Sequence, residues 1–261
     1  MRKALLTIDD SPSQDSDELT LFLKANNVPA VFFCRGDRLK DNPEPMVRAV
    51  ERGFVIANHA FNHRRASQIT FEEAKTEILD TERLIENIYQ QAGKPQPAKY
   101  FRFPHMDRGA GGWVVDYDAV PVHSTALKTL FADGLNVTLD PPSSEQVEKK
   151  RLLQEFLRVA GFTRLPSDDI THKWFTDTEM ADAVDAMFTF STSDWMLTTR
   201  HLGKWPYKSI EDLKQKIDDD PWLNTPASAN IILAHDQPEV LPTVKALVTH
   251  MLHKNFTFTP V

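Results

Sequence analysis

Short apolar runs of strand length alternate with amphipathic helical patterns along most of this 261-residue chain. An apolar run followed by a segment whose apolar positions recur every three or four residues is typical of a β/α fold with parallel strands. Strands are predicted at residues 5–10, 30–34, 54–57, 100–104, 162–165, 187–190, 231–234 and 256–258. The sequence has no internal repeat, so the pattern favours one barrel-like α/β domain over two separate domains.

The alternation fails in the middle of the chain. Glycines and prolines cluster near the start of this segment, at Gly109, Gly111, Gly112, Pro121, Pro141 and Pro142. Periodicity returns there only for a helix at residues 144–161 and the strand at residues 162–165. We therefore expect a single domain over residues 1–261 that carries a loop-rich insertion at about residues 106–185. Because loops at strand ends carry specificity, this insertion is a candidate for substrate selection.

The charge of the chain limits its partners. A net charge of -7 and an isoelectric point near 5.7 disfavour nucleic acids and anionic membrane surfaces, because both bind basic protein surfaces. A polymer substrate is expected to be neutral or cationic. No stretch has the roughly twenty apolar residues of a membrane span. Residues 1–3 lead into the first strand without a signal peptide, so a full-length chain is expected to be cytoplasmic. Nothing in the sequence indicates an oligomeric state.

Two adjacent carboxylates, Asp9 and Asp10, end the first predicted strand. Functional groups of α/β proteins lie at the carboxyl ends of parallel strands. One carboxylate can bind a metal ion while its neighbour accepts a proton, since adjacent side chains at a strand end diverge. The alternative is that both cap the turn that begins at Ser11.

Two histidines, His59 and His63, follow the strand at residues 54–57. Histidines four residues apart on a helical turn point the same way and can hold one Zn²⁺ ion. Two ordinary surface histidines are the alternative. Together with one carboxylate, the two imidazoles would form a ligand set that leaves positions open for water and substrate. Asp9 and Asp10 supply that carboxylate and one spare.

Five short motifs occur in an order and spacing that resembles the polysaccharide deacetylase family, the NodB-homology group of carbohydrate esterase family 4. They are Thr7 to Pro12, His59 to His63, Arg102 to His105, Ser193 to Trp195 and Leu233 to His235. The resemblance covers about residues 4–105 and 186–260. It implies a distorted (β/α) barrel with about seven strands, and removal of acetyl groups from N-acetylated sugars with one divalent metal ion.

The resemblance also implies a role for each motif residue. Asp9 would be the general base, and the metal ligands would be Asp10, His59 and His63. Arg102 would orient the base, His235 would be the general acid, and Asp194 would support either of them. The substrate would contact Pro104, His105, Trp195 and Leu233. His105 stands where the family usually has Tyr, a position that contributes chiefly a backbone N–H to the oxyanion.

The predicted function is metal-dependent removal of an N-acetyl group from a chitooligosaccharide or peptidoglycan-type sugar. The expected cofactor is one divalent ion, Zn²⁺, with Co²⁺ and Mn²⁺ as alternatives. One alternative function is an amidase for a small non-sugar amide or cyclic imide, and another is a catalytically silent glycan-binding module. Several aromatic residues could stack on sugar or anchor loops, with anchoring favoured: Trp113, His123, His172, Trp174, His201 and Trp205.

Overall fold

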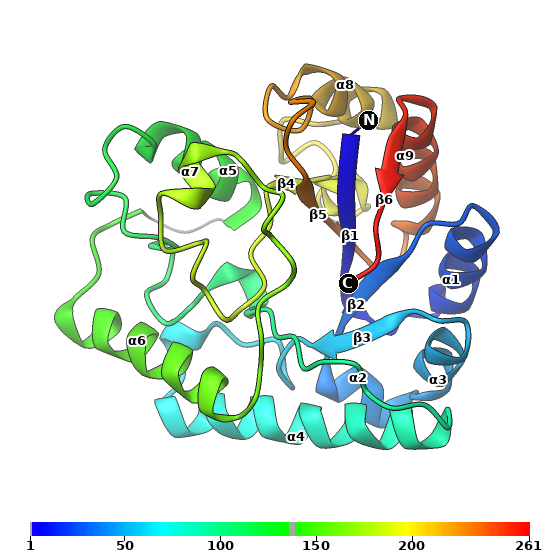
Figure 1. Cartoon of the computed structure of the whole chain (residues 1–261), viewed down its shortest axis with the longest axis horizontal. Helices are drawn as coiled ribbons and strands as arrows, with labels where there is room; N and C mark the ends of the chain where they lie inside the picture. Colours follow the sequence, from blue (N-terminus) through cyan, green and yellow to red (C-terminus); the bar gives the residue numbers. More distant parts are fainter. Residues whose placement is uncertain (1, 136–138) are drawn as a thin grey trace.

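A six-stranded parallel sheet forms the centre of the computed structural model, which describes residues 2–135 and 139–261 (Figure 1). Its strand order is β3-β2-β1-β5-β4, and β6 also pairs with β1. The strands are β1 (Arg2–Ser11), β2 (Ala30–Cys34), β3 (Val55–Asn58), β4 (Phe190–Ser191), β5 (Asn230–His235) and β6 (Phe256–Phe258). All of their pairings are parallel, as the alternating pattern predicts.

Single backbone hydrogen bonds continue the sheet from β3 round to β4. The amide of Asn58 donates to Tyr100, and the amide of Arg102 donates back to Asn58. The amide of Ala186 then donates to Phe101, four residues before β4. Because β4 pairs with β5, these bonds close the sheet into a ring. The fold is therefore the distorted barrel that the sequence predicts.

Two of the predicted strands are reduced to isolated bridges. The segment at residues 100–104 pairs only at Phe101, and the segment at residues 162–165 pairs only at Phe162. Pro104 ends the first segment and Pro166 directly follows the second, and proline has no N–H to continue a ladder. The prediction of full strands at these two places is wrong.

Alternate residues of β1 face two different hydrophobic clusters. Leu6 and Ile8 pack in a cluster with Phe32 and the apolar faces of the covering helices. Leu5 packs in a second cluster that includes Trp113 of the inserted region. Both faces of the central strands are buried, which explains their continuous apolar runs.

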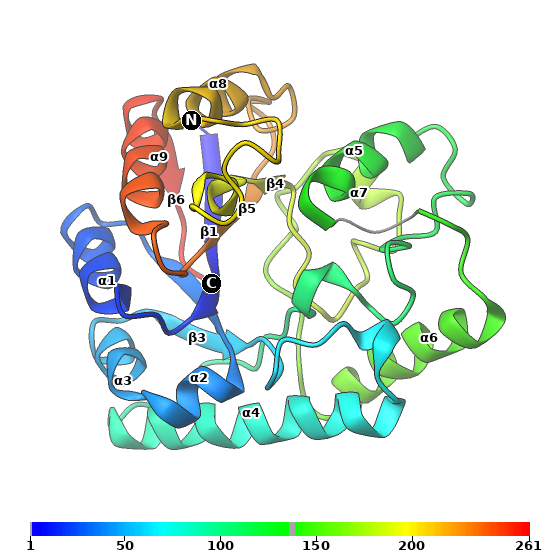
Figure 2. The same ribbon diagram turned by 180° about the vertical axis from the view of Figure 1, so that it is seen from behind.

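Helices cover the sheet, and the predicted insertion, with α5, α6 and α7, lies to one side of it (Figures 1 and 2). The helix α4 begins with a capping box in which Thr70 and Glu73 bond reciprocally, as the sequence predicts. Short 3-10 turns occupy Ala66–Gln68, Pro104–Met106 and Asp194–Leu197. The α-helices are α1 (Ser16–Ala25), α2 (Gly36–Asp41), α3 (Glu44–Glu51), α4 (Phe71–Gln91), α5 (Ser124–Leu135), α6 (Ser144–Val159), α7 (Lys173–Thr176), α8 (Ile210–Asp219) and α9 (Leu241–His253).

The predicted insertion, residues 106–185, contains more helix than its sequence suggests. The helix α5 forms where only loop was expected, because Leu127 and Phe131 bury one of its faces in the second cluster. Residues 136–138 of the predicted insertion lie outside the described residues.

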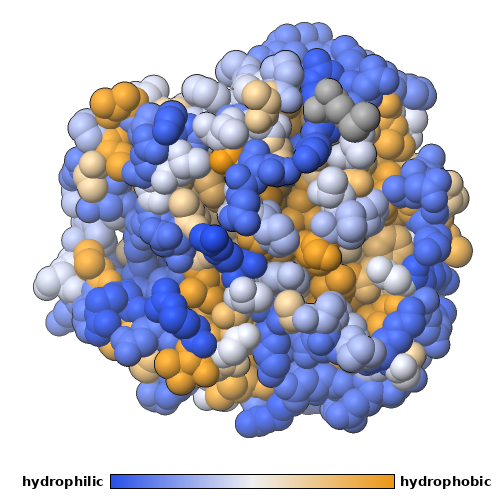
Figure 3. Space-filling model, viewed as in Figure 1, coloured by the Kyte–Doolittle hydropathy of each residue, from blue (hydrophilic) through white to orange (hydrophobic). Residues whose placement is uncertain are grey.

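Hydrophilic side chains cover most of the face shown in Figure 3, with hydrophobic residues in smaller separate areas. Among residues 2–135 and 139–261, no helix combines the length and apolar character that crossing a bilayer requires.

Candidate active site

The carboxyl ends of the central strands open into one cavity of about 860 Å³, called here the strand-end cavity. Asp9 lies beside Phe33 of β2 on one edge of β1 and beside His235 of β5 on the other. His59 follows β3 directly, so its side chain reaches the same end of the sheet. The structure therefore brings together the two strand ends that the sequence predicts to share a site.

Asp10, His59 and His63 form a cluster whose ligand atoms all lie within 4.8 Å of one another. The Nε2 atoms of His63 and His59 lie 3.1 Å and 3.8 Å from Oδ1 of Asp10. That Oδ1 atom is buried and accepts no hydrogen bond from the described residues, whereas Oδ2 accepts one from Gln237. A buried carboxylate oxygen without a donor, facing two imidazole nitrogens, fits a divalent cation.

The protonation states of this cluster also suit a cation. His59 places Nδ1 2.8 Å from the carbonyl oxygen of Arg102. Donation of the Nδ1 hydrogen to this carbonyl leaves Nε2 with a lone pair aimed at the cluster. Burial lowers the pKa of His63 to about 2, so its imidazole is neutral. Burial alone would raise the pKa of Asp10, but the nearby imidazoles and the charge of Arg38 hold it well below its usual range.

The two histidines converge for a different local reason from the predicted one. They do not lie on a helical turn, because Ala60 and His63 both have a φ of 57° and the segment is irregular. Their rings nevertheless lie 5.0 Å apart beside Asp10. Nine non-glycine residues have positive φ in the described parts of the chain, and six of them belong to or adjoin the motifs: Asp10, Ala60, His63, His105, Met106 and Ser193. Such strain is concentrated at functional sites.

Arg102 lies beneath the cavity and is fully buried. Its Nη1 atom donates to Oδ1 of Asp9 at 2.7 Å and to the hydroxyl of Thr7 at 2.9 Å. Its guanidinium also stacks over the ring of Phe33, 4.4 Å from the ring centre. This charge-assisted bond fixes one oxygen of Asp9 and leaves Oδ2 facing the cavity, 3.7 Å from Nε2 of His59.

Asp194 is buried behind His235 and holds it by two bonds. The backbone amide of His235 donates to Oδ2 at 2.9 Å, and Nδ1 lies 2.8 Å from Oδ1. Thr192 donates a further bond to Oδ1. Burial would lower the pKa of His235, but the carboxylate of Asp194 raises it to about 9. The sequence left Arg102 and His235 open as partners of Asp194, and in the structure Asp194 bonds to His235.

The remaining predicted residues line the wall of the strand-end cavity or lie behind that wall. Trp195, Leu233 and His105 line the strand-end cavity, and the His105 ring lies 4.4 Å from that of His63. Burial and the charge of Arg65 lower the pKa of His105 to about 4. Pro104 is buried and supports the turn without lining the cavity.

Several cavity residues were not found from the sequence. Gln237 bonds Asp10 directly, and its position two residues after His235 is the one signal that could have marked it. Arg38 donates to the backbone carbonyl of Asp10, and Phe131 reaches the cavity from α5. Both come from segments with no motif, so only the tertiary fold shows them.

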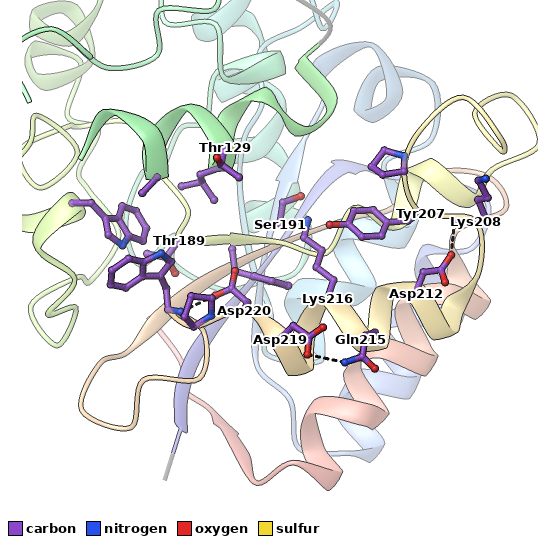
Figure 4. A pocket seen from close by; sticks show the side chains of 17 residues that line it. Thr129, Thr189, Ser191, Tyr207, Lys208, Asp212, Gln215, Lys216, Asp219 and Asp220 are labelled. Atoms are coloured by element: carbon purple, nitrogen blue, oxygen red, sulfur yellow. Dashed lines mark hydrogen bonds between the residues drawn. The ribbon is translucent and has the colours of Figure 1, made fainter. Parts of the chain in front are cut away.

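A second cavity of about 880 Å³ lies between α5 and α8 (Figure 4). Thr129 of α5 and Lys216 of α8 face it from its two sides, and Ser191 of β4 lines both cavities. Trp174 and Trp222 also line this second cavity, with their rings 6.1 Å apart. Trp174 therefore does not contact the strand-end cavity.

The other aromatic candidates divide between packing and the cavity wall. Trp113 is buried against Tyr117, with ring centres 4.9 Å apart. His172 stacks on Trp174 at 5.4 Å, and His123 lies at the surface near Asp177. Two residues that line the strand-end cavity, Trp205 and His201, both pack edge-on against Trp195.

The fold and the cluster define a parallel α/β barrel with a candidate metal site at the carboxyl ends of its strands. Residues 1–110 match the family model described as "Polysaccharide deacetylase". A peptidoglycan-N-acetylglucosamine deacetylase from Bacillus cereus is 30% identical over 90 residues, which cover 34% of this chain and 33% of that protein. The first curated relatives are matched over 18% to 51% of their own length.

Solved structures match nearly the whole chain. A family 4 carbohydrate esterase from Streptomyces lividans, in complex with acetate, has a TM-score of 0.56 at 17% identity, covering 98% of this chain and 91% of that chain. A mutant of a CE4 family pseudoenzyme has a TM-score of 0.59 at 15% identity, covering 100% of this chain and 66% of that chain. The resemblance to the polysaccharide deacetylase family is thus confirmed in the sequence of the N-terminal part and in the fold of the whole chain.

Proposed function

We propose that this chain is a metal-dependent N-deacetylase of N-acetylated carbohydrates. The observation that carries the proposal is one cavity that joins three groups: the Asp10–His59–His63 cluster, Asp9 held by Arg102, and His235 held by Asp194. Amide hydrolysis needs a group that takes a proton from water and another that gives one to the departing amine. An ionised carboxylate and a protonated imidazole supply these two needs.

The cluster would hold one divalent ion, for which Zn²⁺ is our assignment and Co²⁺ and Mn²⁺ are alternatives. When bound, the ion supplies Lewis acidity that polarises the acyl carbonyl and acidifies a water molecule. In the proposed site Asp10, His59 and His63 serve only as its ligands. Gln237 orients the Asp10 carboxylate through its bond to Oδ2.

Asp9 accepts the proton of the attacking water in this proposal. Its Oδ1 atom is occupied by Arg102, so Oδ2 is the atom that takes the proton. The bond from the guanidinium keeps Asp9 oriented. Arg102 is fully buried and cannot touch substrate, so it is a positioning residue.

His235 donates a proton to the leaving amine. Asp194 accepts from Nδ1, which leaves Nε2 to carry the transferred proton. Its raised pKa keeps the imidazole protonated at neutral pH. Trp195 and Leu233 would enclose the acyl group, and the backbone near His105 would stabilise the oxyanion.

The substrate class is inferred from the relatives. The Bacillus cereus relative is named for N-acetylglucosamine in peptidoglycan. The fold alone does not decide activity, because a CE4 family pseudoenzyme shares it. Retention of both Asp9 and His235 favours an active enzyme over a silent glycan-binding module.

Mass spectrometry of Zn²⁺-loaded protein incubated with acetylated chitooligosaccharides, peptidoglycan fragments and small amides tests the proposal. We expect loss of acetyl groups from sugars, abolished by His63→Ala and retained by the surface variant His250→Ala. Hydrolysis of small amides alone would identify an amidase. Binding of sugars without hydrolysis by the loaded protein would identify a glycan-binding module.

A further inference from the structure

The strand-end cavity is positively charged although the chain is acidic. Two carboxylates line it, Asp9 and Asp10. Five basic residues line it as well: Arg35, Arg38, Arg65, Arg200 and Lys204. The net charge of the whole chain is -7, so the charge of this cavity is opposite to that of the protein. A concave wall of one sign focuses its field on the ligand that enters.

Some of these cations are already used inside the protein. Arg35 forms a two-pronged ion pair with Asp37 at 3.1 Å and 2.5 Å. Arg38 donates to the backbone carbonyls of Asp10 and Asp236. These two residues brace the loops around the candidate metal site.

Arg200 and Lys204 differ from Arg35 and Arg38 in their exposure and their partners. Both are exposed at the cavity, and within residues 2–135 and 139–261 neither forms an ion pair with a carboxylate. The Lys204 ammonium donates to the carbonyl of Arg200 at 2.7 Å, which holds the two residues on one turn. Burial lowers the pKa of His201, and the charges of Arg200 and Lys204 lower it further.

The turn that carries them is fixed to the cavity wall. His201 packs edge-on against Trp195 at 4.8 Å, and Nδ1 of His201 lies 2.9 Å from the hydroxyl of Thr198. Trp205 packs against the same Trp195 at 5.1 Å. Because Trp195 would enclose the acyl group, the two cations stand next to the position of the substrate.

We propose that Arg200 and Lys204 form an anion-binding subsite, and that the natural substrate is an N-acylated sugar carrying a carboxylate or phosphate group. This inference rests on the proposed function and narrows its substrate. It differs from the expectation of a neutral or cationic substrate, because that expectation used the net charge of the chain, whereas the cavity has a local charge of opposite sign.

Three sugars test the subsite: neutral N-acetylglucosamine, N-acetylmuramic acid with a carboxylate, and N-acetylglucosamine 6-phosphate. Acetate release gives kcat/KM, and titration calorimetry on the Zn²⁺-loaded protein gives Kd without requiring turnover. We expect at least one anionic sugar to have a kcat/KM about tenfold higher and a Kd about tenfold lower than the neutral one at about 50 mM salt. The advantage should shrink at about 500 mM salt. The carboxylate and phosphate arms show which anion the site prefers.

The double variant Arg200→Ala with Lys204→Ala should lose most of this advantage. The control Lys24→Ala with Arg83→Ala removes two exposed charges outside the cavity and should keep it. Equal values for neutral and anionic sugars, or an advantage that survives in the first variant, would overturn the inference while leaving deacetylation in place. Tighter anion binding without acetate release from any sugar would support the subsite and reject the proposed function.

Discussion

Asp194→Asn should move the basic limb of the pH–rate profile to lower pH. Asp194 accepts from Nδ1 of His235 at 2.8 Å. Burial lowers the pKa of that imidazole, but Asp194 above all, with Asp10 and Asp9, raises it from 6.5 to about 9. The Asn amide keeps the shape of the side chain but removes the charge. Only the charges of Asp9 and Asp10 then oppose the effect of burial, so the pKa of His235 should fall to about 6.5.

The size of the effect follows from the fraction of protonated imidazole. A change in pKa from about 9 to 6.5 lowers the protonated fraction near pH 8 by roughly thirtyfold. Acetate release near pH 8 should fall by a similar factor, while release below pH 6 should change little. The pKa difference corresponds to about 3 kcal/mol between the two protonation states.

The same pair contributes to folding stability with a defined sign. Since the folded-state pKa is raised, the contribution is fully present below about pH 6.5 and is lost as the pH rises through about 9. Denaturant unfolding of wild type should show this loss, and Asp194→Asn should not.

The assay is acetate release across the pH range at fixed metal loading, with NMR titration of the His235 ring. Asp218→Asn is the matched control, because Asp218 pairs with His250 at 2.9 Å outside the cavity. A basic limb at the same pH in Asp194→Asn and wild type would refute the assignment of His235 as the proton donor.

Four other variants test the division of roles and the predicted insertion. Asp9→Asn should retain the metal and lose on the order of a hundredfold or more in kcat, whereas Asp10→Asn should lose the metal, and equal metal loss in elemental analysis would refute this division. Phe131→Leu should change relative kcat/KM among chitooligosaccharides of different length, since Phe131 lines the cavity. Trp113→Phe, packed against Tyr117 away from the cavity, should instead lower only the melting temperature, and equal changes in length preference would argue against a role of α5 in specificity.

The strand ends of the site could be predicted from sequence because local patterns encode them. Asp9 and Asp10 end an apolar run, and parallel strands present their carboxyl ends together. The convergence of His59 and His63 was predicted correctly, but from helical spacing that the chain does not adopt. The left-handed residues that redirect this loop have no sequence signature, since residues other than glycine are uncommon in that conformation.

Long-range partners could not be predicted in the same way. The basic residues of the cavity come from three separate segments, residues 35–38, 65 and 200–204. The net charge of the whole chain therefore does not show that they gather in one place. The helix α5 was missed because glycines and prolines around it indicate loop, whereas burial of Leu127 and Phe131 stabilises it in the fold.

Metal removal and restoration tests the central claim most directly. The protein is treated with a chelator, acetate release from an acetylated chitooligosaccharide is measured, and Zn²⁺ is then added back to wild type and to His59→Ala. We predict that chelation abolishes acetate release, that Zn²⁺ restores it in wild type, and that His59→Ala neither retains the ion nor recovers activity. Full acetate release by the metal-free protein, or full recovery by His59→Ala, would contradict a metal-dependent deacetylase built on Asp10, His59 and His63.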